Sequence, residues 1–119
     1  MRKAALAVDD DRVFVELLWE ILRHRYDVIV AFDGLEAIEA YLRWRERIHL
    51  IVTGLVMPVM RGDEFAERVR RVDPDVPIIV VSGCYERLER LKNRDDLVTI
   101  RKPFTVREVE DAIENCFRE

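Results

Sequence analysis

The sequence predicts an α/β fold in which helices cover both faces of a doubly wound, five-stranded parallel sheet. Five short apolar runs alternate with five segments of helical period along the 119 residues. The runs are continuously apolar rather than alternating, which is typical of strands buried on both faces. Five such strands fit the order 2-1-3-4-5, whose switch point lies between the first and third strands. We therefore expect a three-layer sandwich forming a single domain over residues 1–119.

Polar residues mark the ends of the first strand and the start of the first helix. The run from Lys3 to Val8 predicts a strand, and three consecutive acids follow it. The last of them, Asp11, can cap a helix that we expect to end near His24. The residues expected to face the core are Phe14, Leu17, Leu18, Ile21 and Leu22.

The second strand–helix unit follows directly. The segment from Asp27 to Phe32 predicts a strand, and Asp33 with Glu36 three residues later is typical of a helix start. The buried side of this second helix is predicted to be Ala37, Ile38, Tyr41 and Leu42.

A third strand leads into a long loop. The run beginning at Ile48 is rich in β-branched residues, breaks at Thr53-Gly54, and passes through a loop that Gly62 closes. The third helix begins at Gly62 and is ended by Asp73-Pro74. Its inward residues are predicted to be Phe65, Val69 and Val72.

The last two units are shorter. The apolar run Ile78 to Val81 stops at Ser82, and a weak helical pattern covers 85–92. A final strand is expected from Leu97 to Ile100, before Lys102-Pro103. A capping box at Thr105 then opens a helix whose apolar side is Val109, Ala112, Ile113 and Cys116.

Several unusual polar residues follow strands of this predicted sheet. Asp9 and Asp10 end the first strand, Gly54 the third, Ser82 the fourth, and Lys102 the fifth. The carboxyl ends of parallel strands meet at one edge, so these residues should lie together beside the switch point. Mg²⁺ prefers hard oxygen ligands and keeps several waters, so paired carboxylates at a sheet edge suit it. The sequence thus predicts a site here.

These motifs together resemble the receiver domains of two-component response regulators, the CheY-like branch of the flavodoxin-like folds. That family has an acidic pair after the first strand, an acceptor aspartate after the third, and a loop with Met-Pro and a closing Gly. A Ser or Thr follows the fourth strand, and Lys-Pro follows the fifth. The matching segments here include Asp9-Asp10, Met57-Pro58, Ser82 and Lys102-Pro103, with Gly54 standing where the family has its aspartate.

The resemblance implies a role for each of these residues. Asp10 would bind Mg²⁺ directly and Asp9 through water, with the Val56 carbonyl as a further, weak ligand. Ser82 would hydrogen-bond the phosphoryl oxygens, and Lys102 would neutralise their charge. The partners implied are a histidine kinase or a downstream effector. They would bind the face made by the fourth helix, fifth strand and fifth helix.

Two positions depart from the family pattern. Gly54 has no carboxylate with which to attack a phosphodonor or to bind a metal. Thr53 and the remaining acids are poor substitutes, because Thr53 should point to the opposite face of the strand. At Thr99, the expected switch position, the family usually has a Tyr or Phe that moves on phosphorylation. Any Mg²⁺ binding is therefore expected to be weak or absent.

Three functions fit these observations. The first is a receiver in two-component phosphorelay signalling that does not accept phosphate and acts through protein contacts. The second is an ordinary phosphoaccepting receiver in which residue 54 has been changed from aspartate, or in which a neighbour accepts phosphate. The third is a small Mg²⁺-dependent phosphotransferase or hydrolase using Asp9 and Asp10. We favour the first and expect a signalling protein rather than an enzyme.

Bulk composition limits the partners further. The net charge of −4 argues against direct nucleic-acid binding. The two cysteines, Cys84 and Cys116, lack metal-ligand spacing and suggest reduced thiols in the cytoplasm. No apolar run is long enough to span a membrane, and no effector segment follows the last predicted helix. We expect Trp19 and Trp44 to be packing residues.

Overall fold

Five parallel strands form the central sheet in the computed structural model, which describes residues 2–117. Their order is β2-β1-β3-β4-β5, and every neighbouring pair is parallel. The predicted fold class and strand order are therefore confirmed. The strands are β1 (Ala4–Val8), β2 (Asp27–Ala31), β3 (Ile48–Gly54), β4 (Ile78–Ser82) and β5 (Val98–Arg101).

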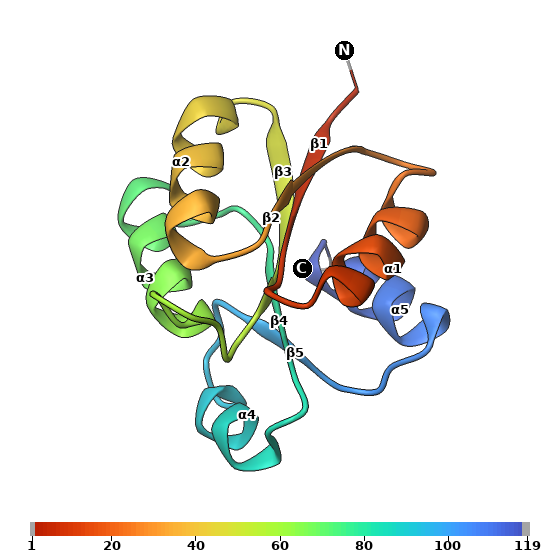
Figure 1. Ribbon diagram of the computed structural model, residues 1–119, viewed down its shortest axis with the longest axis vertical. Helices are drawn as coiled ribbons and strands as arrows, with labels where there is room; N and C mark the ends of the chain where they lie inside the picture. The colour runs from red at the N-terminus through yellow and green to blue at the C-terminus, as the bar shows by residue number, and fades with distance from the viewer. Residues whose placement is uncertain (1, 118–119) are drawn as a thin grey trace.

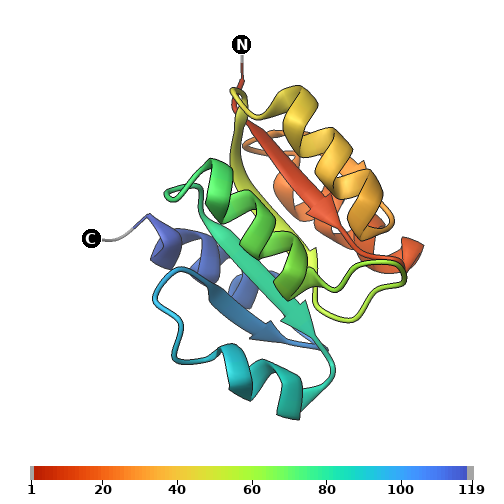
Figure 2. The same cartoon turned by 90° about the vertical axis from the view of Figure 1, so that its left-hand side faces the viewer.

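Helices cover the sheet on both faces, as Figures 1 and 2 show. Helices α2, α3 and α4 contribute to the apolar core on one face, and α1 and α5 to the core on the other. The helices are α1 (Arg12–Leu22), α2 (Gly34–Trp44), α3 (Gly62–Val72), α4 (Tyr85–Leu91) and α5 (Val106–Cys116). None of the helices within residues 2–117 has the length and apolar character needed to cross a bilayer.

The strands supply both cores by alternation. In β1, Leu6 and Val8 belong to the core under α2 and α3, whereas Ala5 and Ala7 belong to the core under α1 and α5. All five β1 residues are buried, because both faces of this central strand are covered. The continuous apolar runs of the sequence follow from this burial.

Three predicted helix starts are confirmed by their caps. Asp11 accepts a hydrogen bond from the Val13 backbone, and Asp33 accepts one from the Glu36 backbone. Thr105 and Glu108 form a complete capping box at the start of α5. Strand boundaries were predicted to within one residue except at β3, which continues two residues further, through Thr53 to Gly54.

Three residues predicted to face the core are exposed instead. Leu17, Leu42 and Val72 lie on the outer flanks of α1, α2 and α3. In α1 the buried residues are Val15, Leu18 and Leu22. A helix turns by about 100° per residue, so apolar residues next to the buried stripe fit an i, i+3, i+4 pattern while facing solvent.

The prediction that both tryptophans are packing residues is also wrong. Trp19 is 40% exposed and Trp44 is 36% exposed. An arginine guanidinium lies over each ring, with Arg23 Cζ 5.0 Å from the Trp19 centroid and Arg43 Cζ 5.1 Å from the Trp44 centroid. The C-terminal ends of α1 and α2 therefore each place a tryptophan and an arginine on the surface.

Candidate functional site

The polar residues that follow the strands do lie together at one edge of the sheet. A hollow of about 250 Å³ opens there, and its lining comes from the ends of β1, β3, β4 and β5. The lining residues that the sequence singled out are Asp9, Gly54, Val56, Ser82, Cys84 and Lys102. Asp10 is exposed and does not line it. Thr99 lies apart, in the middle of β5, with Val80 as its neighbour in β4.

Asp9 forms the polar centre of this hollow. It is the residue directly after β1, it is only 3% exposed, and its Oδ1 accepts a hydrogen bond from the Asp11 backbone at 3.0 Å. Its Oδ2 accepts one from Lys102 Nζ at 2.9 Å. A buried carboxylate needs such partners, because an unpaired charge away from water is costly.

Lys102 is held by contacts on three sides. Its backbone N–H donates to the Ser82 carbonyl at 2.9 Å, which extends the pairing of β5 with β4. Its ammonium lies 3.6 Å from the centroid of the Phe14 ring, on α1. Phe14 in turn packs against Phe104, with centroids 5.0 Å apart. The lysine charge is therefore placed between a carboxylate and an aromatic face.

Sequence reasoning missed the part that Phe14 has in this site. It assigned Phe14 to the core from its helical spacing alone. The spacing of Phe14 and Phe104, each close to a polar strand end in the sequence, was the available signal. Only the packing of α1 beside the β5–α5 connection shows that these rings border Lys102.

Gly54 is buried at the end of β3, next to Asp9. A Cβ built at this position would lie 2.7 Å from Asp9 Oδ2 and 3.0 Å from Asp9 Cγ. The Asp9 carboxylate thus extends into the space that a side chain of residue 54 would use. The backbone there does not have positive φ, so an L side chain meets no conformational penalty. The three atoms nearest to such a Cβ all belong to Asp9.

Gly62 fixes the loop that follows Gly54. A Cβ at Gly62 would lie 1.9 Å from the Gly54 carbonyl oxygen, a distance that backbone atoms cannot accommodate. The Gly62 N–H donates to the Leu55 carbonyl at 2.8 Å. The start of α3 therefore packs directly on the end of β3, and residue 62 has to be glycine.

Val59 in the same loop has a strained backbone. Its φ is 72°, the left-handed region, and its side chain is 78% exposed. A β-branched residue rarely adopts this conformation.

Two hydroxyl groups near the hollow are engaged in local hydrogen bonds. Ser82 is buried, and its Oγ accepts a hydrogen bond from the Cys84 backbone at 3.0 Å. Thr53 is fully buried, and its Oγ1 donates to the Gly54 carbonyl at 2.9 Å. Thr53 does not line the hollow, in agreement with the expectation that it points away from residue 54.

Asp10 experiences the charge of its neighbour. Although Asp10 is exposed, partial loss of solvent around its carboxyl raises its pKa, and so do a hydrogen bond with Asp9 and the Asp9 charge, whereas Lys102 lowers it to a smaller extent. Lys102 is paired with Asp9, so its charge offsets little of the rise in the pKa of Asp10.

The carboxylates do not make a complete metal site. No cluster of three or more His, Cys, Asp or Glu side chains suited to a metal occurs within residues 2–117. Asp9 is already paired with Lys102. Mg²⁺ usually takes one or two carboxylates in an octahedral shell, and Asp10 alone is free to supply one here. These residues do not fit a firmly held Mg²⁺.

Comparison with known proteins identifies the family. The sequence profile of the response regulator receiver domain matches residues 5–114. The chain belongs to the response regulator receiver domain family. It is thus a receiver domain of two-component signalling, a class of signalling modules rather than classical enzymes. Receiver domains generally bind Mg²⁺ at the acceptor site and interact with histidine kinases and effectors.

Individual relatives agree with this assignment. The response regulator receiver protein Anae109_2439 of Anaeromyxobacter sp. is 35% identical over 109 residues, covering 89% of this chain and 45% of that protein. Chemotaxis protein CheY of Halobacterium salinarum is 31% identical and covers 95% of each chain. The structure of chemotaxis protein CheY4 of Vibrio cholerae superimposes with a TM-score of 0.84 at 25% identity, covering 98% of this chain and 100% of that one. The receiver spans about half the length of several curated relatives.

Proposed function

We propose that this receiver domain does not accept phosphate and transmits its signal through protein–protein contacts. In this proposal Gly54 occupies the position of the acceptor aspartate. The observation that carries it is the place of Gly54 in the hollow, at the end of β3 beside Asp9 and together with Ser82 and Lys102. A phosphoaspartate requires a carboxylate nucleophile at this point, and glycine supplies none.

The Asp9–Lys102 ion pair supports the same proposal. In a site that has the acceptor aspartate, Lys102 would neutralise the charge of the phosphoryl group and Asp9 would bind the metal through water. Here the two side chains neutralise each other at 2.9 Å. Asp9 Oδ2 also takes part of the space beside Gly54. The hollow is therefore lined by a mutually neutralising pair, which lessens its attraction for both Mg²⁺ and phosphate.

Neighbouring residues are poor substitutes for the acceptor. Thr53 is buried and does not line the hollow, and the Asp9 carboxylate is paired with the Lys102 ammonium. Asp10 is exposed, and it does not line the hollow that contains Gly54. No observation favours the phosphotransferase or hydrolase alternative.

The partner surface that we propose is the face formed by α4, β5 and α5. Tyr85 is exposed at the start of α4, and Arg101 Cζ lies 5.0 Å from the centroid of its ring. Thr99 is partly exposed in β5 and has no aromatic ring to move. We propose that this face keeps a single conformation, and that a kinase or an effector recognises it in that conformation.

The test is phosphorylation by acetyl phosphate with Mg²⁺, followed by intact-mass measurement. The unmodified chain should show no added phosphoryl group. Gly54→Asp should gain one, because its new carboxylate would enter the hollow beside Ser82 and Lys102. Asp9 must move to admit it. Without Mg²⁺ we therefore expect this variant to lose about 1–3 kcal/mol of stability from steric and charge crowding.

Gly83→Asp is the matched control. It adds the same carboxylate to the lining of the same hollow, but from the end of β4, and its Cβ would meet only Lys102 Cβ at 3.9 Å. It should remain unphosphorylated. A stable phosphoryl adduct on the unmodified chain contradicts the proposal. A folded Gly54→Asp variant that takes no phosphate shows that Gly54 is not at an acceptor position.

A further inference from the structure

A continuous row of arginine and tryptophan side chains lies at the amino edge of the sheet, the opposite edge from the hollow. We call it the Arg–Trp edge and define it as Arg2, Trp19, Arg23, Arg43, Trp44 and Arg47. Its α1 half begins with Trp19, over which Arg23 stacks. Arg2 then donates through Nη2 to the Arg23 carbonyl at 2.8 Å. The contact connects α1 to the residues that precede β1.

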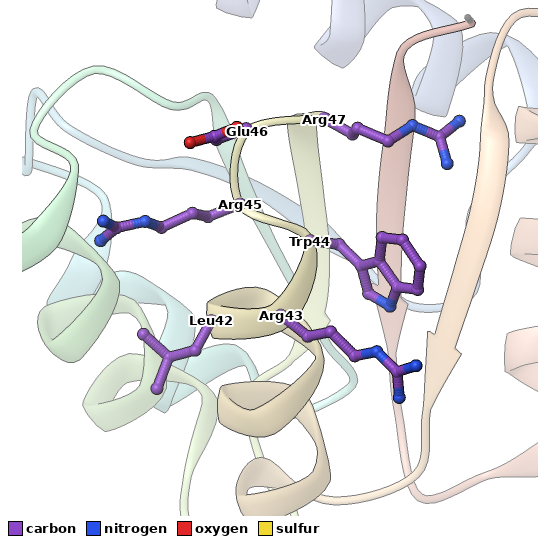
Figure 3. Close-up of a pocket in the computed structure, with 6 residues that line it drawn as sticks. All are labelled: Leu42, Arg43, Trp44, Arg45, Glu46 and Arg47. Atoms are coloured by element: carbon purple, nitrogen blue, oxygen red, sulfur yellow. The ribbon is translucent and has the colours of Figure 1, made fainter.

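The α2 half continues the row. Arg47 Nη2 donates to the Arg2 carbonyl at 3.0 Å, and the Arg47 backbone donates to the Trp44 carbonyl at 2.9 Å. In Figure 3, Arg43, Trp44 and Arg47 point to the side of α2 on which β1 and β2 lie, whereas Arg45 points toward α3. The end of α2 and the residues after it line a surface hollow of about 410 Å³.

The Arg–Trp edge lies on both sides of strand β2. Asp27, the first residue of β2, accepts from Arg47 Nη2 at 2.6 Å and lies 3.9 Å from Arg2 Nε. β2 is the outermost strand on its side of the sheet, so its outer backbone groups have no neighbouring strand among residues 2–117. Helices α1 and α2, which carry Trp19 and Trp44, lie on opposite faces of the sheet to which this open strand belongs (Figure 1).

The charge of the Arg–Trp edge is positive although the whole chain carries −4. Its four arginines face two acids, Asp27 and Glu20, and Glu20 pairs with Arg23 at 3.2 Å. Arg43 makes no ion pair within the described residues. These six charged groups therefore have a net charge of +2, with Arg43 left without an ion pair, next to two exposed indole rings.

We propose that the Arg–Trp edge binds an acidic protein segment that lies in extended conformation along the outer edge of β2. An added strand would satisfy the open backbone groups of β2, and its alternate side chains would turn toward Trp19 and Trp44. Its carboxylates would pair with Arg43 and would share Arg23 with Glu20, since that ion pair is exposed. Arginine and tryptophan are the residue types that most often dominate binding at protein interfaces.

A protein segment fits this surface better than a nucleic acid does. Asp27 lies at its centre, and the net charge of the whole chain is −4. A phosphate backbone needs a basic face with few acids, and repulsion from the rest of the chain would oppose it. An extended peptide matches the width of the single open edge of β2, and its backbone would also hydrogen-bond to the free backbone groups of that strand.

The test is fluorescence titration of the full chain with a synthetic peptide of alternating Glu and Val, which contains no aromatic residue. Trp19 and Trp44 are the only tryptophans in the chain, so the signal comes from the proposed surface alone. We expect a saturable change that weakens as salt is added, and no such change with a peptide of alternating Lys and Val. Hydrogen exchange of residues 27–31 should slow in the complex.

Variants locate the binding. Arg23→Gln with Arg43→Gln should weaken peptide binding by about tenfold, because two exposed ion pairs are lost. The matched control is Arg68→Gln with Arg107→Gln, which removes two exposed arginines from α3 and α5 and should leave binding unchanged. The proposal is overturned if both double variants weaken binding equally, or if the titration gives no saturable signal. It is also overturned if hydrogen exchange in 27–31 does not change, or if a single-stranded oligonucleotide binds more tightly than the peptide.

Discussion

Asp10 lies beside a second carboxylate, and its pKa is raised by burial and by that neighbour. The folded chain therefore holds the Asp10 proton up to a higher pH than the unfolded chain does. Ionisation of Asp10 costs folding stability, and this cost is absent below the ordinary value of 3.8 and complete above the raised value. The acidic pair thus weakens the fold at neutral pH.

Asp10→Asn should accordingly stabilise the chain at pH 7. The gain should shrink as the pH falls through the raised pKa and vanish near pH 3.8, where the native Asp10 is already protonated. Urea unfolding of both chains at several pH values measures it. Asp95→Asn, an exposed change in the loop before β5, is the control, and an equal gain there would show a general effect of net charge.

Val59 illustrates strain that one residue brings to a loop. Its left-handed φ costs about 1–2 kcal/mol for a residue with a Cβ. Glycine would remove that cost, while its extra freedom in the unfolded chain would return about 0.5–1 kcal/mol. The loop keeps its shape despite this strain because Gly62 and Leu55 fix its end.

At the scale of elements, Arg70 joins three segments that are far apart in the sequence. From the last turn of α3, its Nη1 donates to the Val76 carbonyl and its Nη2 to the Asp96 carbonyl, each at 2.6 Å. The first contact holds the loop before β4, and the second holds the loop before β5. The position of β5, and with it Lys102, depends on this contact.

Arg70→Gln should lower the free energy of unfolding by about 2 kcal/mol, because two partly buried carbonyls lose a charged donor. Arg68→Gln, an exposed change on the same helix, should stay within about 0.5 kcal/mol of the unmodified chain. Chemical denaturation followed by circular dichroism compares the two variants. Similar stability in both would mean that water replaces the Arg70 contacts without loss.

At the scale of the whole molecule, the hollow and the Arg–Trp edge lie at opposite edges of the sheet. The acids that follow β1 lie at the carboxyl edge with the hollow, and the Arg–Trp edge lies at the amino edge. The two surfaces are separated by the length of the strands. We therefore expect binding at one to leave the chemistry of the other unchanged.

Mg²⁺ should stabilise the unmodified chain only slightly. A ligand adds RT ln(1 + [L]/Kd), so a site weaker than about 10 mM gives a melting shift of about 1 °C at about 5 mM Mg²⁺. Differential scanning calorimetry with NaCl at matched ionic strength measures this. A shift of several degrees that only Mg²⁺ produces would show that Asp9 leaves Lys102 for the metal.

The order of the elements and the position of the hollow were predictable from the sequence. The period of the apolar residues identifies the strands and helices. Because the strands are parallel, Asp9, Gly54, Ser82 and Lys102 come to one edge of the sheet regardless of how their side chains are oriented. The roles of these residues remain predictions. What could not be predicted depends on neighbours from other elements, as with the Phe14 ring over Lys102 or the contacts of Arg70.

Exposure on the helix flanks was unpredictable for the same reason. Leu17, Leu42 and Val72 are apolar and lie beside the buried stripe of their helices, so period alone assigns them to the core. Whether these side chains are covered depends on how far away the adjacent helix lies and on how close the side chain is to the edge of the sheet. The period of the sequence gives neither distance.

The position of Lys102 over Phe14 has a magnetic consequence. An aromatic ring current shields nuclei that lie above its face. Lys102 Nζ lies 3.6 Å from the ring centroid, so the terminal protons of this side chain should resonate upfield of those of an ordinary lysine. Lys102 is one of only three lysines, and the other two, Lys3 and Lys92, lie outside the hollow. A single resonance thus reports whether the ammonium remains between Asp9 and the ring, without any change to the chain.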